Sequence, residues 1–255
     1  MARVEGKVAI ITGGASGLGL ASARRMAEEG ATVILADINT AQGERAAADV
    51  PGAEFAQLDV TREAAWIELI DAVVARHGRL DVLVNCAGIV ELASIEDTTE
   101  DIWRRVNAVG TDGTFYGCKH ALRVMKQAGR GSIINMCSTA SIQGGPGIFA
   151  YAASKSAIRG MTKSVAVHSV QNGFGVRCNS VHPGNMETPM LKGVREIVRE
   201  ASPEAAKSME EIWIGEPEDV ANMVLFLASD ESGAVNGAAM VVDNTTTITE
   251  GRVPA

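Results

Sequence analysis

The sequence of 255 residues has few of the features that characterise metal-binding, disulfide-linked or membrane-spanning proteins. Its four cysteines, Cys86, Cys118, Cys137 and Cys178, are widely spaced, with no CxxC pair and no Cys/His cluster at zinc spacing. Neither a metal nor a disulfide framework is therefore expected, and each thiol should lie buried among apolar residues. No stretch approaches the roughly 20 apolar residues of a membrane span, and the N-terminus has no signal-peptide pattern. These absences predict a soluble, cytoplasmic protein.

The chain also has no excess of basic residues. Lysine and arginine number 23 against 31 aspartates and glutamates, which gives a formal net charge of −8. This balance disfavours nucleic acid and an anionic membrane surface as partners. The 46% hydrophobic content suits a large core, and the sequence shows no internal repeat and no linker. We therefore expect a single domain over residues 1–255.

Short β-branched runs alternate with longer helical patterns along the whole chain. Strands are predicted at Val8–Thr12, Thr32–Ala36, Phe55–Leu58, Val82–Asn85, Ser132–Cys137, Val176–Val181 and Ala239–Asp243. Helices are predicted at Gly17–Glu29, Thr40–Asp49, Arg62–His77, Thr99–Lys126, Tyr151–Gln171 and Pro217–Ser229. Apolar strands separated by helices predict an α/β fold, a doubly wound (Rossmann-type) parallel sheet of about seven strands with helices on both faces.

A glycine-rich turn, Thr12–Gly19, follows the first strand and leads into the first helix. Glycines let backbone N–H groups approach a pyrophosphate at a helix N-terminus. Asp37 ends the second strand about 20 residues on, where an acid can bond both ribose hydroxyls of an adenosine and repel a 2′-phosphate. The pattern predicts NAD rather than NADP as cofactor. The alternative is that Asp37 is a turn or cap residue.

Further strand ends carry Asp59 and Val60, then Asn85, Ala87 and Gly88. In an open α/β sheet, ligands bind beyond the carboxyl ends of the strands. Turn chemistry explains each of these residues singly but explains the series poorly. The cofactor residues expected from the loop and the strand ends are Gly13, Ser16, Gly17, Leu18, Gly19, Asp37, Ile38, Asp59, Val60, Asn85, Ala87 and Gly88.

The stretch from Ser138 to Lys155 contains the candidate chemistry. Tyr151 and Lys155 are four residues apart, so they share one face of the predicted helix. A nearby cation favours the ionised form of a tyrosine, which suits the pair to proton transfer with a substrate oxygen held by Ser138. The alternative is an exposed helix face with an ordinary tyrosine and lysine.

Together these features resemble the short-chain dehydrogenase/reductase family, over essentially the whole chain. Thr12–Gly19 matches its Thr-Gly-x-x-x-Gly-x-Gly cofactor loop, and Tyr151-x-x-x-Lys155 matches its catalytic signature. Ser138 lies thirteen residues before the tyrosine, as in the family. Asn107 matches the family's helix asparagine, and Pro183-Gly184 followed by Thr188 matches its nicotinamide-side segment.

The resemblance implies hydride transfer with NAD. Tyr151 would be the acid/base on the substrate oxygen, and Ser138 would orient and polarise that oxygen. Lys155 would assist the tyrosine and bind the nicotinamide ribose, and Asn107 would hold a water that relays the proton through Lys155. The alternative for Asn107 is a role in local packing or hydration. The remaining cofactor contacts would come from Tyr151, Lys155, Pro183, Gly184, Met186 and Thr188.

The resemblance also implies a homotetramer, with the helices over 99–126 and 151–171 forming a four-helix contact between subunits. Four positions depart from the commonest family pattern: Cys86, Cys137, His182 and Asn244. None removes a catalytic group, so the expected effect is on packing under the cofactor and around the last strand. His182 as an additional acid/base is the less favoured alternative.

Substrate selection is expected from residues 139–149 and from an insertion at about 188–213. The insertion alternates apolar and charged residues, as a mobile lid would; a plain surface helical pair is the alternative. The expected substrate-binding residues are Ser138, Ala140, Gln143, Tyr151, Met190 and Leu191.

These residues suit a neutral, largely apolar substrate. The segment from Ser180 to Met190 resembles bacterial hydroxysteroid and alicyclic alcohol dehydrogenases of the family, so a steroid, terpene or cyclic secondary alcohol is expected. Two alternatives remain: a 3-oxoacyl-type reductase on the same fold, and a non-catalytic NAD-binding regulatory protein.

Overall fold

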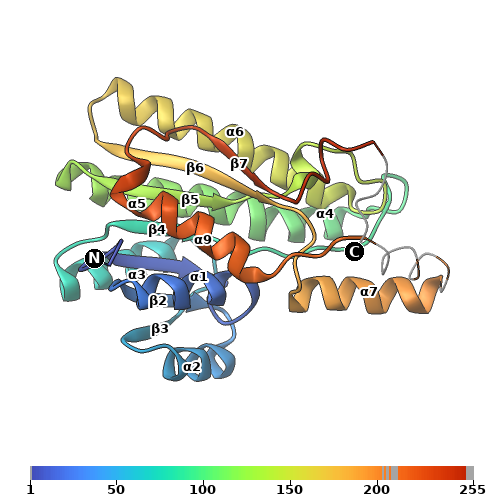
Figure 1. The fold of residues 1–255 in the computed structure, drawn as a ribbon, viewed down its shortest axis with the longest axis horizontal. Helices are drawn as coiled ribbons and strands as arrows, with labels where there is room; N and C mark the ends of the chain where they lie inside the picture. Colours follow the sequence, from blue (N-terminus) through green and yellow to red (C-terminus); the bar gives the residue numbers. More distant parts are fainter. Residues whose placement is uncertain (1, 203, 205–206, 208–211, 251–255) are drawn as a thin grey trace.

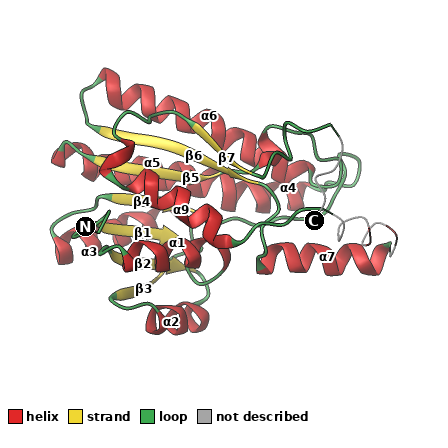
Figure 2. Cartoon of the chain, in the orientation of Figure 1, coloured by secondary structure: helices red, strands yellow, loops and turns green. Residues whose placement is uncertain are grey.

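The computed structural model describes residues 2–202, 204, 207 and 212–250. Within them, seven parallel strands form one sheet in the order β3-β2-β1-β4-β5-β6-β7. The strands are β1 (Val8–Thr12), β2 (Thr32–Asp37), β3 (Ala53–Gln57), β4 (Val82–Asn85), β5 (Gly131–Met136), β6 (Val176–Pro183) and β7 (Ala239–Val242). The predicted doubly wound parallel sheet is confirmed, and Figure 2 shows the strands as one layer with helices on both sides.

The helices divide between the two faces of this sheet. They are α1 (Gly17–Glu28), α2 (Thr40–Asp49), α3 (Glu63–His77), α4 (Glu100–Asn107), α5 (Gly113–Ala128), α6 (Phe149–Gln171), α7 (Pro189–Ala201) and α9 (Pro217–Ala228). Helices α1, α2 and α9 contribute to one buried cluster, and α3, α5 and α6 contribute to the other. Helix α7 stands away from the sheet, at the end of the molecule opposite the N-terminus (Figure 1).

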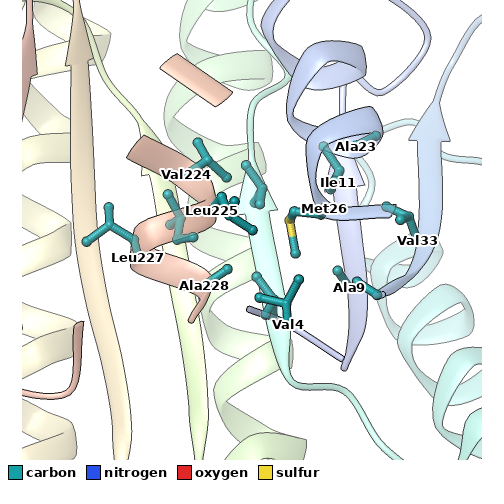
Figure 3. Close-up of a cluster of buried hydrophobic side chains, with 14 of the residues drawn as sticks. Val4, Ala9, Ile11, Ala23, Met26, Val33, Val224, Leu225, Leu227 and Ala228 are labelled. Atoms are coloured by element: carbon teal, nitrogen blue, oxygen red, sulfur yellow. The ribbon is translucent and has the colours of Figure 1, made fainter. Parts of the chain in front are cut away.

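The core forms because successive strand residues point to opposite faces of the sheet. In β1, Ile11 packs into the cluster under α1 and α9, and Ile10 packs into the cluster under α3 and α5. Figure 3 shows Met26 of α1 and Leu225 of α9 in the same cluster as Ile11. Burial of both faces explains why the strands read as continuous apolar runs.

The predicted helix over 99–126 is interrupted by a π-helical turn at Ala108–Asp112, which joins α4 to α5. Gly110 lies so close to α6 that a Cβ there would overlap Ser154 Oγ. Thr111 Oγ1 lies 3.0 Å from both Asn107 Oδ1 and Ser154 Oγ. The extra residue of the π turn therefore occurs where the long helix crosses α6. The other predicted boundaries shift by two residues or fewer, as in β3, which begins at Ala53 rather than Phe55.

No helix among the described residues has both the length and the apolar character needed to cross a bilayer. The four thiols are free; Cys118, Cys137 and Cys178 are buried and Cys86 is half-buried.

Candidate active site

The sheet order reverses direction between β1 and β4, the point at which doubly wound sheets bind ligands. A cavity of about 900 Å³ opens there, beyond the carboxyl ends of the strands. Its walls come from the segments that follow each of the strands β1 to β7, together with α6 and α7. Most of the residues predicted for cofactor and substrate therefore line one space.

The glycine-rich turn after β1 is shaped for close backbone approach. Gly13 has φ +64°, and a Cβ there would lie 3.1 Å from Ala87 Cα. A Cβ on Gly19 would overlap the Gly13 carbonyl oxygen. Ser16 is the N-cap residue of α1, and its side chain makes no capping hydrogen bond among the described residues. The first N–H groups of a helix have no intrahelical partner. The turn thus fits a pyrophosphate at the N-terminus of α1.

Thr12 joins this turn to the loop that follows β4. Its buried Oγ1 accepts hydrogen bonds from the N–H groups of Cys86 and Ala87, each 3.0 Å long. These bonds fix the floor of the cavity between the two strands. Gly88 continues this floor towards Lys155, whose Nζ would lie 3.5 Å from a Cβ on Gly88.

Asp37 ends β2 at the rim of the cavity. One carboxylate oxygen accepts the Ala15 N–H at 3.2 Å and the other accepts the Asn39 N–H at 3.0 Å. The carboxylate is therefore held in place beside Ile38, which is also on the cavity wall. Within the described part of the chain, Lys155 is the one cationic side chain that lines the cavity. This end of the cavity therefore presents a fixed carboxylate.

Ser138, Tyr151 and Lys155 line the same cavity. Lys155 is 5% exposed; its Nζ donates to the Met136 carbonyl oxygen at 2.8 Å and lies 5.4 Å from the centre of the Tyr151 ring. Ser138 Oγ accepts the Ala140 N–H at 3.1 Å. Because that bond uses an oxygen lone pair, the Ser138 hydroxyl proton is free to point at a substrate oxygen.

The structure does not bring Asn85 and Asn107 to the cavity surface, although both were predicted as site residues. Asn85 is buried in β4, where its amide donates to Asn135 Oδ1 at 2.8 Å. Asn107 donates to the Trp103 carbonyl oxygen at 2.9 Å and accepts from Thr111. The Asn107 side chain and the amide nitrogen of Asn85 are thus committed to contacts within the fold, whereas Asn85 Oδ1 is buried without a hydrogen-bond partner among the described residues.

The other predicted residues line the cavity as a group: Gly13, Ser16, Gly17, Leu18, Gly19, Asp37, Ile38, Asp59, Val60, Ala87, Gly88, Ser138, Ala140, Gln143, Tyr151, Lys155, Pro183, Gly184, Met186, Thr188, Met190 and Leu191. Sequence reasoning missed Ile89, Val90, Leu92 and Thr246, whereas Ile148 and Asn185 fall in the stretches 139–149 and 180–190 that it singled out. The missed residues belong to no motif. The available signal was the place of the first three, directly after the end of β4.

Helix α7 supplies the apolar outer wall. Met190, Leu191, Val194 and Val198 line the cavity from it, at the spacing of one helix face. Glu187 is paired with Lys192 at 3.3 Å and with Arg195 at 3.5 Å, beside the first turn of the helix. Residues 203, 205–206 and 208–211 of the predicted insertion lie outside the described residues.

Cys86 and His182, two of the positions that depart from the commonest family pattern, lie near the reacting groups. Burial raises the pKa of the Cys86 thiol to about 11, despite the opposing charge of Lys155, so Cys86 presents a neutral thiol to the cavity. Burial lowers the pKa of His182 to about 4, and this side chain lies behind the cavity wall, with no exposed surface. A neutral imidazole outside the cavity is poorly placed to act on a substrate proton.

The fold and this site define a nicotinamide-dinucleotide oxidoreductase of the doubly wound class. A family profile described as enoyl-(acyl carrier protein) reductase matches residues 13–247. The chain belongs to the short-chain dehydrogenase/reductase family.

Similar proteins share nearly the full length. The NADP-dependent (R)-specific alcohol dehydrogenase of Lentilactobacillus kefiri is 41% identical over 94% of this chain and 96% of its own. The 3-alpha-(or 20-beta)-hydroxysteroid dehydrogenase of Mycobacterium bovis is 42% identical over 96% of this chain and 90% of its own. The crystal structure of levodione reductase, 32% identical, superposes with a TM-score of 0.89 over 97% of this chain and all of that chain.

Proposed function

We propose that this protein is an NAD-dependent secondary alcohol dehydrogenase acting on a neutral, largely apolar cyclic alcohol or hydroxysteroid. The observation that carries the proposal is the position of Ser138, Tyr151 and Lys155 in one cavity with the glycine-rich turn and Asp37. The relative from Mycobacterium bovis, named for a hydroxysteroid, supports the substrate class.

The proposed roles of the side chains come from the family resemblance and are consistent with their contacts. A bound nicotinamide dinucleotide would accept the hydride. Ser138 donates its hydroxyl proton to the substrate oxygen, and the Tyr151 phenolate takes the alcohol proton. The Lys155 ammonium is held by the Met136 carbonyl, with its Nζ 5.4 Å from the centre of the Tyr151 ring. The water relay through Asn107 rests on the family resemblance alone, and an Asn107→Ala variant with unchanged turnover would remove Asn107 from the proposal.

We propose NAD rather than NADP as the cofactor because β2 ends in an acidic residue, Asp37. A 2′-phosphate next to Asp37 would place like charges together, and within the described part of the chain no cationic side chain besides Lys155 lines the cavity. Because one relative is named NADP-dependent, this point needs a direct test. We expect a higher kcat/KM with NAD than with NADP, and a shift of that ratio towards NADP in Asp37→Ser. A wild-type preference for NADP would overturn the cofactor assignment.

The substrate class is proposed from the walls beyond the reacting groups. They are apolar on the α7 side and contain, among the described residues, no cation besides Lys155 to hold a carboxylate or phosphate. We therefore expect turnover of cyclic alcohols and hydroxysteroids, with weak activity on 3-oxoacyl thioesters. The absorbance of reduced nicotinamide across a substrate panel measures this. Faster turnover of the thioesters would favour the reductase alternative.

We propose that residues 188–213 act as a lid, with α7 as its described part. The helix combines an apolar face on the cavity with an exposed outer side, and Figure 1 shows it away from the sheet. Such a segment closes over substrate to exclude water. Bound NAD and substrate analogue should protect it from limited proteolysis; equal cleavage with and without ligands would contradict the lid.

A homotetramer is also proposed, through the outer faces of α5 and α6. Phe115, Val167 and Val170 of these helices are between 46% and 68% exposed. Light scattering coupled to size exclusion should give four times the mass of the 26.7 kDa chain. A monomer at micromolar concentration would contradict this assembly.

A further inference from the structure

A buried histidine lies directly behind the turn that carries Ser138. His182 is in β6, and its ring makes three short contacts. Nδ1 lies 3.0 Å from Ser141 Oγ and 3.2 Å from the Ser138 carbonyl oxygen. Nε2 lies 2.8 Å from Ser180 Oγ. The imidazole thus contacts the backbone of Ser138 from the side away from the cavity, which it does not line.

The three contacts select one tautomer of a neutral ring. Burial, together with the charges of Arg159 and Lys155, lowers the pKa of His182 to about 4, so the ring carries a single proton at neutral pH. A proton on Nε2 would leave the Nδ1 lone pair facing the Ser138 carbonyl oxygen. A proton on Nδ1 is donated to that oxygen and to Ser141 Oγ, while the Ser180 hydroxyl donates to Nε2. Only the second arrangement makes all three contacts of the ring hydrogen bonds, and it turns the Ser180 hydroxyl to Nε2 at 2.8 Å rather than to the Ala238 carbonyl oxygen at 3.3 Å.

The Ser138 carbonyl is held by further donors from the same turn. The Ser141 hydroxyl donates to it at 2.8 Å and the Ser141 N–H at 3.1 Å. Arg159 of α6 donates to the Ser141 carbonyl at 3.3 Å, and the Cys137 thiol lies 3.3 Å from Ser141 Oγ. These bonds fix the backbone of Ser138, and through it the direction in which the hydroxyl leaves the chain.

We propose that His182 is a positioning residue for Ser138. Its Nδ1–H and the Ser141 hydroxyl hold the Ser138 carbonyl, so that the serine hydroxyl points at the substrate oxygen. This inference rests on the proposed alcohol dehydrogenase function. His182 touches neither substrate nor cofactor. The positioning role requires a hydrogen-bond donor at the δ position of the side chain. An asparagine amide supplies such a donor, whereas a leucine does not.

The kinetic test compares matched variants with NAD and a cyclic secondary alcohol that the wild type oxidises. Ser141→Ala should lower kcat about three- to tenfold, as expected for the loss of a buried hydrogen bond, with KM for NAD unchanged. His182→Leu should lower kcat at least as much, and His182→Asn should retain near wild-type turnover. The control is Ser169→Ala, which removes buried hydrogen bonds to Val176 between the same α6 and β6, at the start of β6. Its kcat should equal that of the wild type.

A second measurement reads the tautomer without turnover. The chain has four histidines, so long-range nitrogen–proton correlation spectra of protein labelled with ¹⁵N-histidine resolve each ring, and the signals lost in His182→Asn identify His182. We expect the proton on Nδ1. A proton on Nε2, or an equal kcat for Ser141→Ala and Ser169→Ala, would overturn the inference. If His182→Leu fails to fold, these two results still decide it. A wild type inactive on every alcohol would instead refute the proposed function.

Discussion

Lowering the pH from 7.5 to 5 should destabilise this protein, and a large share of the loss should come from His182. Burial lowers its pKa from 6.5 to about 4 in the folded chain. The unfolded chain therefore binds more protons between these two values. The contribution of the neutral ring is complete above pH 6.5 and is lost as the pH falls towards 4. Each pKa unit corresponds to about 1.4 kcal/mol, so the loss is about 2 kcal/mol by pH 5.

Urea unfolding followed by tryptophan fluorescence measures this loss at the two pH values, at one protein concentration. His182→Asn has no titrating ring and should lose about 2 kcal/mol less than the wild type on acidification. His168→Asn, which removes an exposed histidine of α6, should lose as much as the wild type. Carboxylates with lowered pKa values, such as Glu63 and Glu91, are common to all three proteins. Equal losses in the wild type and His182→Asn would refute the reasoning.

Three further predictions concern other parts of the chain. Thr245 has φ +70°, a strained conformation for a β-branched residue, so Thr245→Gly should stabilise the protein by about 1 kcal/mol; a lower urea midpoint would count against this. Met26 is fully buried beside α9, and Met26→Ala should cost about 2–5 kcal/mol, whereas an unchanged midpoint would exclude a packed cluster there. The raised pKa of Cys86, about 11 against 9.0, predicts alkylation by iodoacetamide about a hundredfold slower than in a free peptide. Equal rates by mass spectrometry would contradict that burial.

The features that could be predicted from the sequence are those that depend on local geometry. The strand–turn–helix at Thr12–Gly19 requires glycines because of positive φ and close backbone approach, and both appear in the structure. The pairing of Tyr151 with Lys155 follows from helical spacing alone. The burial of both faces of the sheet follows from continuous apolar strands. Each of these features depends on residues that lie within about 20 positions of one another in the sequence.

The features that escaped prediction depend on partners distant in the sequence. The π turn at Ala108–Asp112 depends on Ser154, and the inward orientation of Asn85 depends on Asn135, 50 residues away. His182 was noted as unusual, but its role behind Ser138 requires the pairing of β5 with β6. A side chain such as Ile89 reaches the cavity without belonging to any motif. Tertiary contacts, which no local pattern encodes, decide these positions.

The central claim is that Tyr151 transfers the substrate proton in an NAD-dependent alcohol oxidation. The most direct test measures formation of reduced nicotinamide from NAD and a cyclic secondary alcohol by the wild type and Tyr151→Phe. NAD binding, followed by fluorescence titration, serves as the control. The account predicts that the variant binds NAD normally but loses turnover by about 10²–10⁴-fold, the usual contribution of a general acid or base. Full turnover in Tyr151→Phe would contradict it.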